Sequence, residues 1–341
     1  MAGSDASIQA AIFGCASLRL SDAEKSFFAK VDPLGFILFS RNIDTPAQVA
    51  ALVAEFRECV GRDAPVLIDQ EGGRVQRLRP PHWRKRPPMA VFGALAAKDR
   101  ALACRAARLN AHLIAADLAA LGINVDCAPL IDVPTLGSHD IIGDRAFAPD
   151  PVLVGELGRA VHDGLLDGGV MPVVKHIPGH GRAVVDSHLD LPVVDADMET
   201  LVGWDFPPFR VLADAPWAMT AHIIYRAIDL EHPATISPRV IGDVIRGVIG
   251  CRSFLLSDDL SMKALSGDFA QRTHASLAAG CDAVLHCNGD MAEMEAVAGA
   301  LRPLSDAARE RLDRALSMPR ATSLPDGAQE CLDRWLAGVI S

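Results

Sequence analysis

A loop rich in histidine and glycine carries the densest group of reactive side chains. The segment KHIPGHGRAVVDSHLDLP, residues 175 to 192, holds three histidines, two aspartates and a lysine within 16 residues. Glycine is unfavourable in a helix interior, so this composition indicates a functional loop rather than an ordinary solvated one. Asp186 and His188 lie two residues apart, and the carboxylate can hold the imidazole in one tautomer and raise its basicity. The pair predicts a general acid and base.

A second segment, SFLLSDDLSM at residues 253 to 262, begins with a predicted strand that ends in two adjacent carboxylates. Consecutive residues of a strand point to opposite faces, so Asp258 and Asp259 should have different roles. A carboxylate at such a strand end can be a nucleophile, a base or a metal ligand. The alternative is an aspartate that caps the next helix, which fits Asp259 better.

Two further segments offer side chains that could bind a polar substrate. In LIDQEGGRVQRL, residues 67 to 78, Asp69 can accept hydrogen bonds from two sugar hydroxyls. The following glycine pair permits a tight turn that returns Arg74 and Arg77 toward the same place. In IIGDRAFAPDP, residues 141 to 151, Arg145 lies in a loop and could clamp a polar group. Each arginine alone could equally be a surface residue.

These segments follow short apolar runs that are typical of strands buried on both faces, with helical stretches between them. The predicted strands are residues 10 to 14, 35 to 39, 65 to 71, 123 to 129, 170 to 176, 218 to 223, 253 to 259 and 282 to 287. The predicted helices are residues 46 to 60, 98 to 121, 150 to 167, 238 to 249 and 266 to 279, with further helices between 290 and 340.

Eight such βα units predict an α/β fold, a single (β/α)8 TIM-type barrel, with a doubly wound sheet as the alternative. In a barrel the chemistry lies at the carboxyl ends of the strands. The polar residues Asp69, Lys175, His176, His222 and Asp258 all follow predicted strands. We therefore expect residues 1 to 341 to form one barrel domain, with the helices of 290 to 340 packed on it.

Composition excludes several classes of protein. The chain has 341 residues and a formal net charge of -10, which gives no basic surface for nucleic acid or anionic lipid. No apolar run approaches the ~20 residues of a membrane-spanning helix, and no basic residue precedes the first apolar run, as a secretory signal would require. The eight cysteines form no C-x-x-C pair and indicate reduced, mostly core residues. We expect a cytoplasmic, monomeric protein that binds neither nucleic acid nor membrane.

The motifs DQEGGRVQRL, GDRAF, KHIPGHGRAVVDSH and SDDLSM, in this order between residues 69 and 262, resemble those of a known family. They are similar to the bacterial exo-β-N-acetylglucosaminidases of glycoside hydrolase family 3, of the single-domain cell-wall-recycling type. Two departures are visible: Ile177 stands where the family commonly has Phe, and Ala146 where Ser is usual. Both flank matched polar residues and concern their positioning.

The resemblance implies a retaining enzyme, a β-N-acetylhexosaminidase that removes terminal β-linked N-acetylglucosamine from peptidoglycan fragments such as anhydro-muropeptides. It implies Asp258 as the nucleophile and His188, supported by Asp186, as the general acid and base. No metal or other cofactor is implied. The implied sugar-binding residues are Asp69, Arg77, Arg145, Lys175 and His176.

Other functions remain open on the sequence. The same barrel could be a β-glucosidase, or a phosphorylase, because a histidine acid and base does not repel phosphate. A metal-dependent amidohydrolase could use His176, His180, His188, His222 and Asp258, although the first strand lacks the usual H-x-H. A non-catalytic sugar-binding barrel would require the nucleophile or acid to be missing, and both are present.

Overall fold

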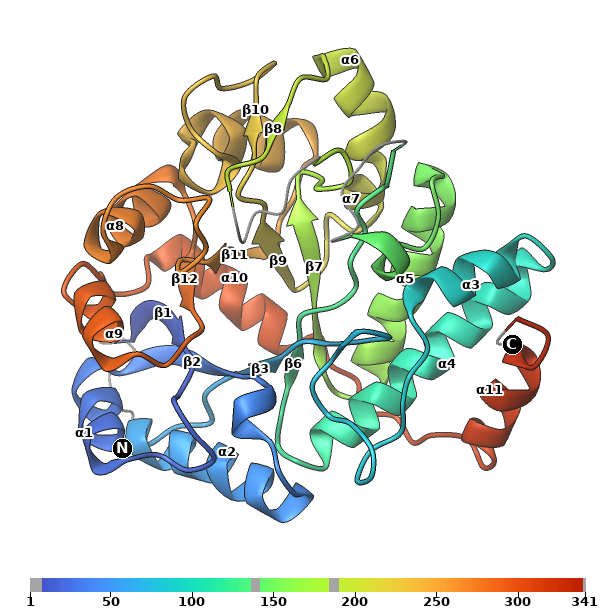
Figure 1. The fold of residues 1–341 in the computed structure, drawn as a ribbon, viewed down its shortest axis with the longest axis horizontal. Helices are drawn as coiled ribbons and strands as arrows, with labels where there is room; N and C mark the ends of the chain where they lie inside the picture. Colours follow the sequence, from blue (N-terminus) through green and yellow to red (C-terminus); the bar gives the residue numbers. More distant parts are fainter. Residues whose placement is uncertain (1–7, 136–141, 184–189, 340–341) are drawn as a thin grey trace.

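A closed barrel of eight parallel strands forms the centre of the molecule (Figure 1). The computed structural model describes residues 8–135, 142–183 and 190–339. The strand order is β1-β12-β11-β9-β7-β6-β3-β2, which confirms the barrel and rules out the doubly wound sheet. The barrel strands are β1 (Gln9–Phe13), β2 (Pro33–Leu38), β3 (Val66–Ile68), β6 (Val125–Asp126), β7 (Met171–Ile177), β9 (Trp217–Thr220), β11 (Phe254–Asp259) and β12 (Ala283–His286).

Each of the eight predicted runs overlaps one barrel strand, but β3 and β6 are shorter than predicted. After β3 the chain leaves the barrel and forms a small antiparallel sheet of β4 (Gln70–Gly72) and β5 (Val75–Gln76). After β6 the chain stays beside β7 through backbone hydrogen bonds and an isolated bridge between Leu130 and Lys175. A second small sheet pairs β8 (Val193–Val194) with β10 (Ile224–Tyr225).

Helices lie between the strands and begin at recognisable caps. Thr45 accepts a hydrogen bond from the N–H of Gln48 and is followed by Pro46, so α2 begins where the sequence predicts. Asp150 and Pro151 do the same for α5. The helices that match predictions are α2 (Pro46–Val60), α4 (Arg100–Ala119), α5 (Pro151–Asp167), η6 (Val240–Val248) and α8 (Phe269–Ala279).

Other helices were not predicted, or are short connections. Helix α1 (Asp22–Val31) begins with a capping box between Ser21 and Glu24, a signal that the sequence contains. Helix α3 (Met89–Ala96) begins without a side-chain cap. The short helical segments are η2 (Ser40–Asn42), η3 (Gly143–Arg145), α6 (Met198–Thr200), η4 (Leu201–Asp205), α7 (Pro207–Val211) and η5 (Ala234–Ile236).

The last helices are α9 (Met291–Ala298), α10 (Asp306–Leu316) and α11 (Ala328–Leu336). Helix α9 contacts α8, α10 contacts β11, and α11 lies against α4 (Figure 1). Across the described ranges, no helix is long and apolar enough to cross a membrane.

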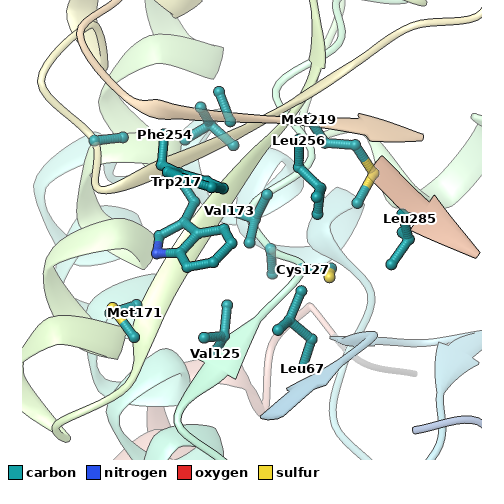
Figure 2. Packing of buried hydrophobic residues seen from close by; sticks show 14 of the residues in the cluster. Leu67, Val125, Cys127, Met171, Val173, Trp217, Met219, Phe254, Leu256 and Leu285 are labelled. Atoms are coloured by element: carbon teal, nitrogen blue, oxygen red, sulfur yellow. The ribbon is translucent and has the colours of Figure 1, made fainter. Parts of the chain in front are cut away.

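The barrel interior is filled by apolar side chains at alternate strand positions (Figure 2). Met171 and Val173 of β7 are inside, so the next inward position of this strand is Lys175. The same alternation in β3 makes Leu67 an inward residue, and Asp69 is the next inward position. The packed core therefore ends, at the carboxyl face, in a layer of polar side chains. The labelled interior residues of Figure 2 are Leu67, Val125, Cys127, Met171, Val173, Trp217, Met219, Phe254, Leu256 and Leu285.

Candidate active site

A cavity of about 190 Å³ lies at the carboxyl ends of the barrel strands. We call it the mouth cavity. Its apolar wall includes Ile37, Met219, Met262 and Leu285. Its polar lining is Asp69, Arg77, Arg145, Lys175, His176, His180, Asp258 and Asp259.

Lys175 joins two carboxylates, the partly buried Asp69 and the buried Glu71, at the mouth cavity. Its Nζ lies 2.9 Å from Asp69 Oδ1 and 2.6 Å from Glu71 Oε1, and only 3% of its side chain is exposed. Each carboxylate also has a guanidinium partner: Arg77 Nη2 lies 2.9 Å from Asp69 Oδ2, and Arg145 Nη2 lies 2.8 Å from Glu71 Oε1. These five side chains form one charged network of three cations and two carboxylates.

The charged network fixes the ionisation of its own members. Burial alone would raise the pKa of Asp69, but the Lys175 ammonium and the Arg77 guanidinium outweigh it and hold that pKa well below its usual range. For Glu71, Arg145 and Lys175 likewise overcome burial and lower its pKa to about 2. Burial would lower the pKa of Lys175, yet the two carboxylates raise it above its ordinary value. All three groups are therefore charged at neutral pH.

Asp132 organises the beginning of the histidine-rich loop. Its Oδ2 lies 2.8 Å from Nδ1 of His176, and its Oδ1 accepts hydrogen bonds from the N–H groups of His176 (3.2 Å) and His180 (2.6 Å). Burial raises the pKa of Asp132, but the neighbouring His176 reverses this and the net shift is downward. A charged Asp132 therefore fixes the orientation of the His176 ring through its Nδ1.

Two further contacts hold the same loop. The hydroxyl of Tyr225 donates to the carbonyl oxygen of Gly179 (2.7 Å), and Arg182 Nε lies 2.7 Å from Asp205 Oδ2. Gly179 has a φ of 137°, which favours glycine. The chain is thus anchored up to Ala183, just before the segment that carries Asp186 and His188.

The two adjacent aspartates of β11 have different surroundings, as the sequence predicts. Asp258 follows the inward positions Phe254 and Leu256, and its Oδ1 accepts the N–H of Asp259 at 2.8 Å. The carboxylate of Asp259 instead binds the N–H of Ser261 (3.0 Å) and of Cys287 (3.2 Å). Asp259 stabilises loop backbone, while Asp258 continues the inward row into the cavity.

The structure brings together six of the residues that the sequence singled out, since Asp69, Arg77, Arg145, Lys175, His176 and Asp258 all line the mouth cavity. Asp186 and His188 lie outside the described residues. Arg74, which the glycine turn was expected to return to the site, instead pairs with Asp144 at 3.3 Å. The two departures from the family pattern, Ala146 and Ile177, are buried apolar packing residues.

Glu71 and Asp132 were missed as site residues. Glu71 was visible in the DQEGG motif after the third predicted strand. Its importance comes from Lys175 and Arg145, which are distant in sequence. Asp132 contacts His176 across 44 residues. Only the fold reveals these pairings.

Two of the candidate metal ligands named for an amidohydrolase, His176 and His222, have other partners. His222 Nδ1 lies 2.7 Å from Thr235 Oγ1, and its Nε2 lies 3.0 Å from the carbonyl oxygen of Asp259. His176 is bound to Asp132. Within the described ranges, no group of three or more His, Cys, Asp or Glu side chains is arranged to hold a metal ion.

Comparison with known proteins identifies the family. The family model described as the glycosyl hydrolase family 3 N terminal domain matches residues 8–318. The chain belongs to glycoside hydrolase family 3. The match covers all six described site residues, from Asp69 to Asp258.

Individual relatives show which enzymes of the family this chain is similar to. A β-hexosaminidase of Alkalilimnicola ehrlichii is 40% identical over 299 residues, covering 86% of this chain and 84% of that protein. Another, of Thiobacillus denitrificans, is 41% identical over 265 residues, covering 75% and 72%. The structure of NagZ from Neisseria gonorrhoeae in complex with N-trifluoroacetyl-D-glucosamine superposes with a TM-score of 0.87 and 31% identity, over 98% of both chains. These matches place the chain among the β-hexosaminidases of the family.

Proposed function

We propose that this protein is a retaining exo-β-N-acetylglucosaminidase that acts on peptidoglycan fragments such as anhydro-muropeptides. The observation that carries the proposal is the meeting of Asp258 with the charged network in one small cavity. Asp69 offers a carboxylate for sugar hydroxyls, and Arg77, Arg145 and Lys175 offer donors. The bound N-trifluoroacetyl-D-glucosamine of the Neisseria relative supports an N-acyl-glucosamine as the ring in the cavity.

In the proposed mechanism Asp258 attacks the anomeric carbon while His188 protonates the leaving oxygen. The C–O bond to the leaving group breaks and a glycosyl ester of Asp258 forms. His188 then takes a proton from water, which attacks the same carbon and releases Asp258. Two inversions give retention. An imidazole with a pKa of about 6.5 can donate a proton near neutral pH without the desolvation that a neutral carboxyl needs.

The proposed role of Asp186 is to orient His188 and to stabilise its imidazolium form. The contacts of Asp132, Tyr225 and Arg182 support this assignment, because they fix the chain that leads into the segment carrying the pair. Eight cysteines without a disulfide support a reducing compartment, so we propose the cytoplasm as the location.

The test compares turnover of 4-nitrophenyl β-N-acetylglucosaminide with that of the β-glucoside, in the presence and absence of phosphate. We expect strong preference for the N-acetylated substrate and free N-acetylglucosamine as product in both buffers. Preference for the glucoside would identify a β-glucosidase. A sugar 1-phosphate product would identify a phosphorylase. Loss of activity with a chelator, restored by zinc, would favour a metal-dependent enzyme.

Asp258→Ala tests the chemistry directly. Because Asp258 forms the covalent bond, the variant should lose at least about a thousandfold in kcat while binding N-acetylglucosamine with wild-type affinity. Asp259→Ala is the matched control for an adjacent carboxylate, since it removes loop contacts but no reacting atom. If Asp258→Ala retained turnover and Asp259→Ala lost it, the nucleophile would be Asp259.

A further inference from the structure

A second hollow lies beside the mouth cavity. It has a volume of about 210 Å³ and is lined by residues of two neighbouring loops. Ser40 and Asp44 come from the loop after β2, and Arg79 and Trp83 come from the long loop after β3. Both loops follow the carboxyl ends of their strands, so the hollow opens at the catalytic face of the barrel. We call it the outer hollow.

Arg77 connects the outer hollow to the mouth cavity, because it lines both. It is held on one side by Asp69, at 2.9 Å, and its guanidinium carbon lies 5.2 Å from the centre of the Phe39 ring. Phe39 lines the mouth cavity, and the next residue, Ser40, lines the outer hollow. The two spaces are therefore neighbours separated by one fixed side chain.

The lining of the outer hollow has the groups that a pyranose ring requires. Trp83 is half-buried and packs against the core. The centroid of its ring lies 5.7 Å from that of the His82 ring. An aromatic surface of this kind suits the apolar face of a sugar. Asp44 and Arg79 are exposed, and the described residues give neither of them a salt-bridge partner. Arg79 is oriented by a 2.7 Å hydrogen bond from its Nε to the carbonyl oxygen of Gln76.

Size favours the same ligand class. The outer hollow is about as large as the mouth cavity, 210 Å³ against 190 Å³. Both are several times the ~30 Å³ that a water molecule occupies in the liquid. A space that matches the one proposed for a sugar ring, and that touches it through Arg77, suits the next ring of the same chain.

We propose that the outer hollow binds the first sugar ring of the leaving group. Trp83 contacts the apolar face of this ring, Asp44 accepts a hydrogen bond from a hydroxyl, and Arg79 donates one. This inference rests on the proposed function, since it assumes that the cleaved sugar occupies the mouth cavity. It makes the enzyme selective for saccharide leaving groups over smaller alcohols.

The experiment uses Trp83→Ala, Trp83→Phe and Asp44→Ala in the full-length protein. The readouts are kcat/KM for the disaccharide N,N'-diacetylchitobiose and the inhibition constant of N-acetylglucosamine, which has no leaving group. Trp83→Ala should lower kcat/KM for the disaccharide about tenfold, the equivalent of one aromatic contact, and leave the inhibition constant within twofold of wild type. Trp83→Phe should recover most of the loss.

Two controls separate this role from a structural one. Trp335→Ala removes another partly buried tryptophan, on α11, and should leave both readouts at wild-type values. Asp44 is exposed, so Asp44→Ala should keep wild-type melting while the disaccharide kcat/KM falls severalfold. Equal losses in disaccharide turnover and N-acetylglucosamine binding would overturn the proposal, and so would wild-type disaccharide kinetics in Trp83→Ala and Asp44→Ala. If the wild-type protein neither bound N-acetylglucosamine nor cleaved the disaccharide, the proposed function itself would fail.

Discussion

Replacing Lys175 by Met should destabilise the whole protein as well as the site. The side chain is 3% exposed, and its ammonium lies within 2.9 Å of two carboxylates. Removing one partner from a buried ion pair costs about 3 to 5 kcal/mol, because the other charge stays buried. Arg77 and Arg145 still contact the two carboxylates, so we expect the lower end, about 3 kcal/mol. Met has a similar length and leaves little empty space.

Urea unfolding at pH 7 measures the free energy of unfolding. The slope of this free energy against urea concentration checks for two-state behaviour. Lys30→Met is the control, since Lys30 is exposed and its loss should change the free energy by less than about 0.5 kcal/mol. Adding Glu71→Gln to Lys175→Met removes the charge of one of the two carboxylates that have lost the ammonium as a partner. The double variant should therefore be less destabilised than the sum of the two single variants.

The pH dependence of the free energy of unfolding follows from the directions of the pKa shifts in the charged network. Asp69 and Glu71 have lowered pKa values in the folded protein, so their contribution is present above their unfolded values near 4 and is lost as pH falls through the folded ones. Lys175 has a raised pKa, so its contribution is complete below its unfolded value near 10.4 and is lost as pH rises through the folded one. The difference between wild type and Lys175→Met should be largest between about pH 4 and 10. A cost below about 1 kcal/mol at pH 7, or strict additivity in the double variant, would refute the network.

Two predictions concern the histidine-rich loop. Asp132→Asn should lower kcat/KM about tenfold or more, because a neutral amide cannot hold His176 and both backbone N–H groups as a carboxylate does; wild-type kinetics with N-acetylglucosaminides would contradict this. His188→Ala should lose less activity on aryl substrates, which need little protonation, than on a disaccharide, so the ratio of their kcat/KM values should rise, with a milder rise in Asp186→Ala. Equal proportional losses on both substrates would mean that another residue supplies the proton.

The barrel strands and the polar residues at their carboxyl ends could be predicted from short-range patterns, whereas the roles proposed for these residues came from the family resemblance. Strand β7 alternates inward and outward residues, so Met171 and Val173 in the core imply Lys175 at the mouth. The same period of two places Asp258, and not Asp259, in the inward row; the residues alone left this choice open, and the family resemblance implied Asp258. Helix α1 was missed although its capping box, Ser21 with Glu24, was readable.

The partners of these residues could not be predicted, because they depend on loops that meet only in the folded barrel. Glu71 contacts Arg145 across 74 residues, and nothing local to either residue identifies the other. Asp132 follows the shortest barrel strand, where the predicted run extended past the point at which the chain leaves the sheet. Sequence reasoning therefore found the side chains that line the mouth cavity more readily than those that fix them.

Charge balance links the buried network to the proposed second half-reaction. Taken alone, the network has three cations and two carboxylates and so one net positive charge, which a charged Asp258 in the same cavity offsets. When Asp258 is esterified to the sugar, the network loses that counter-charge. Hydrolysis of the ester restores the carboxylate and with it the counter-charge, so the cations favour the release of Asp258 as the leaving group. Neutralising Arg145 should for this reason slow the second half-reaction more than the first, which burst kinetics with an activated aryl substrate would show as accumulated glycosyl-enzyme.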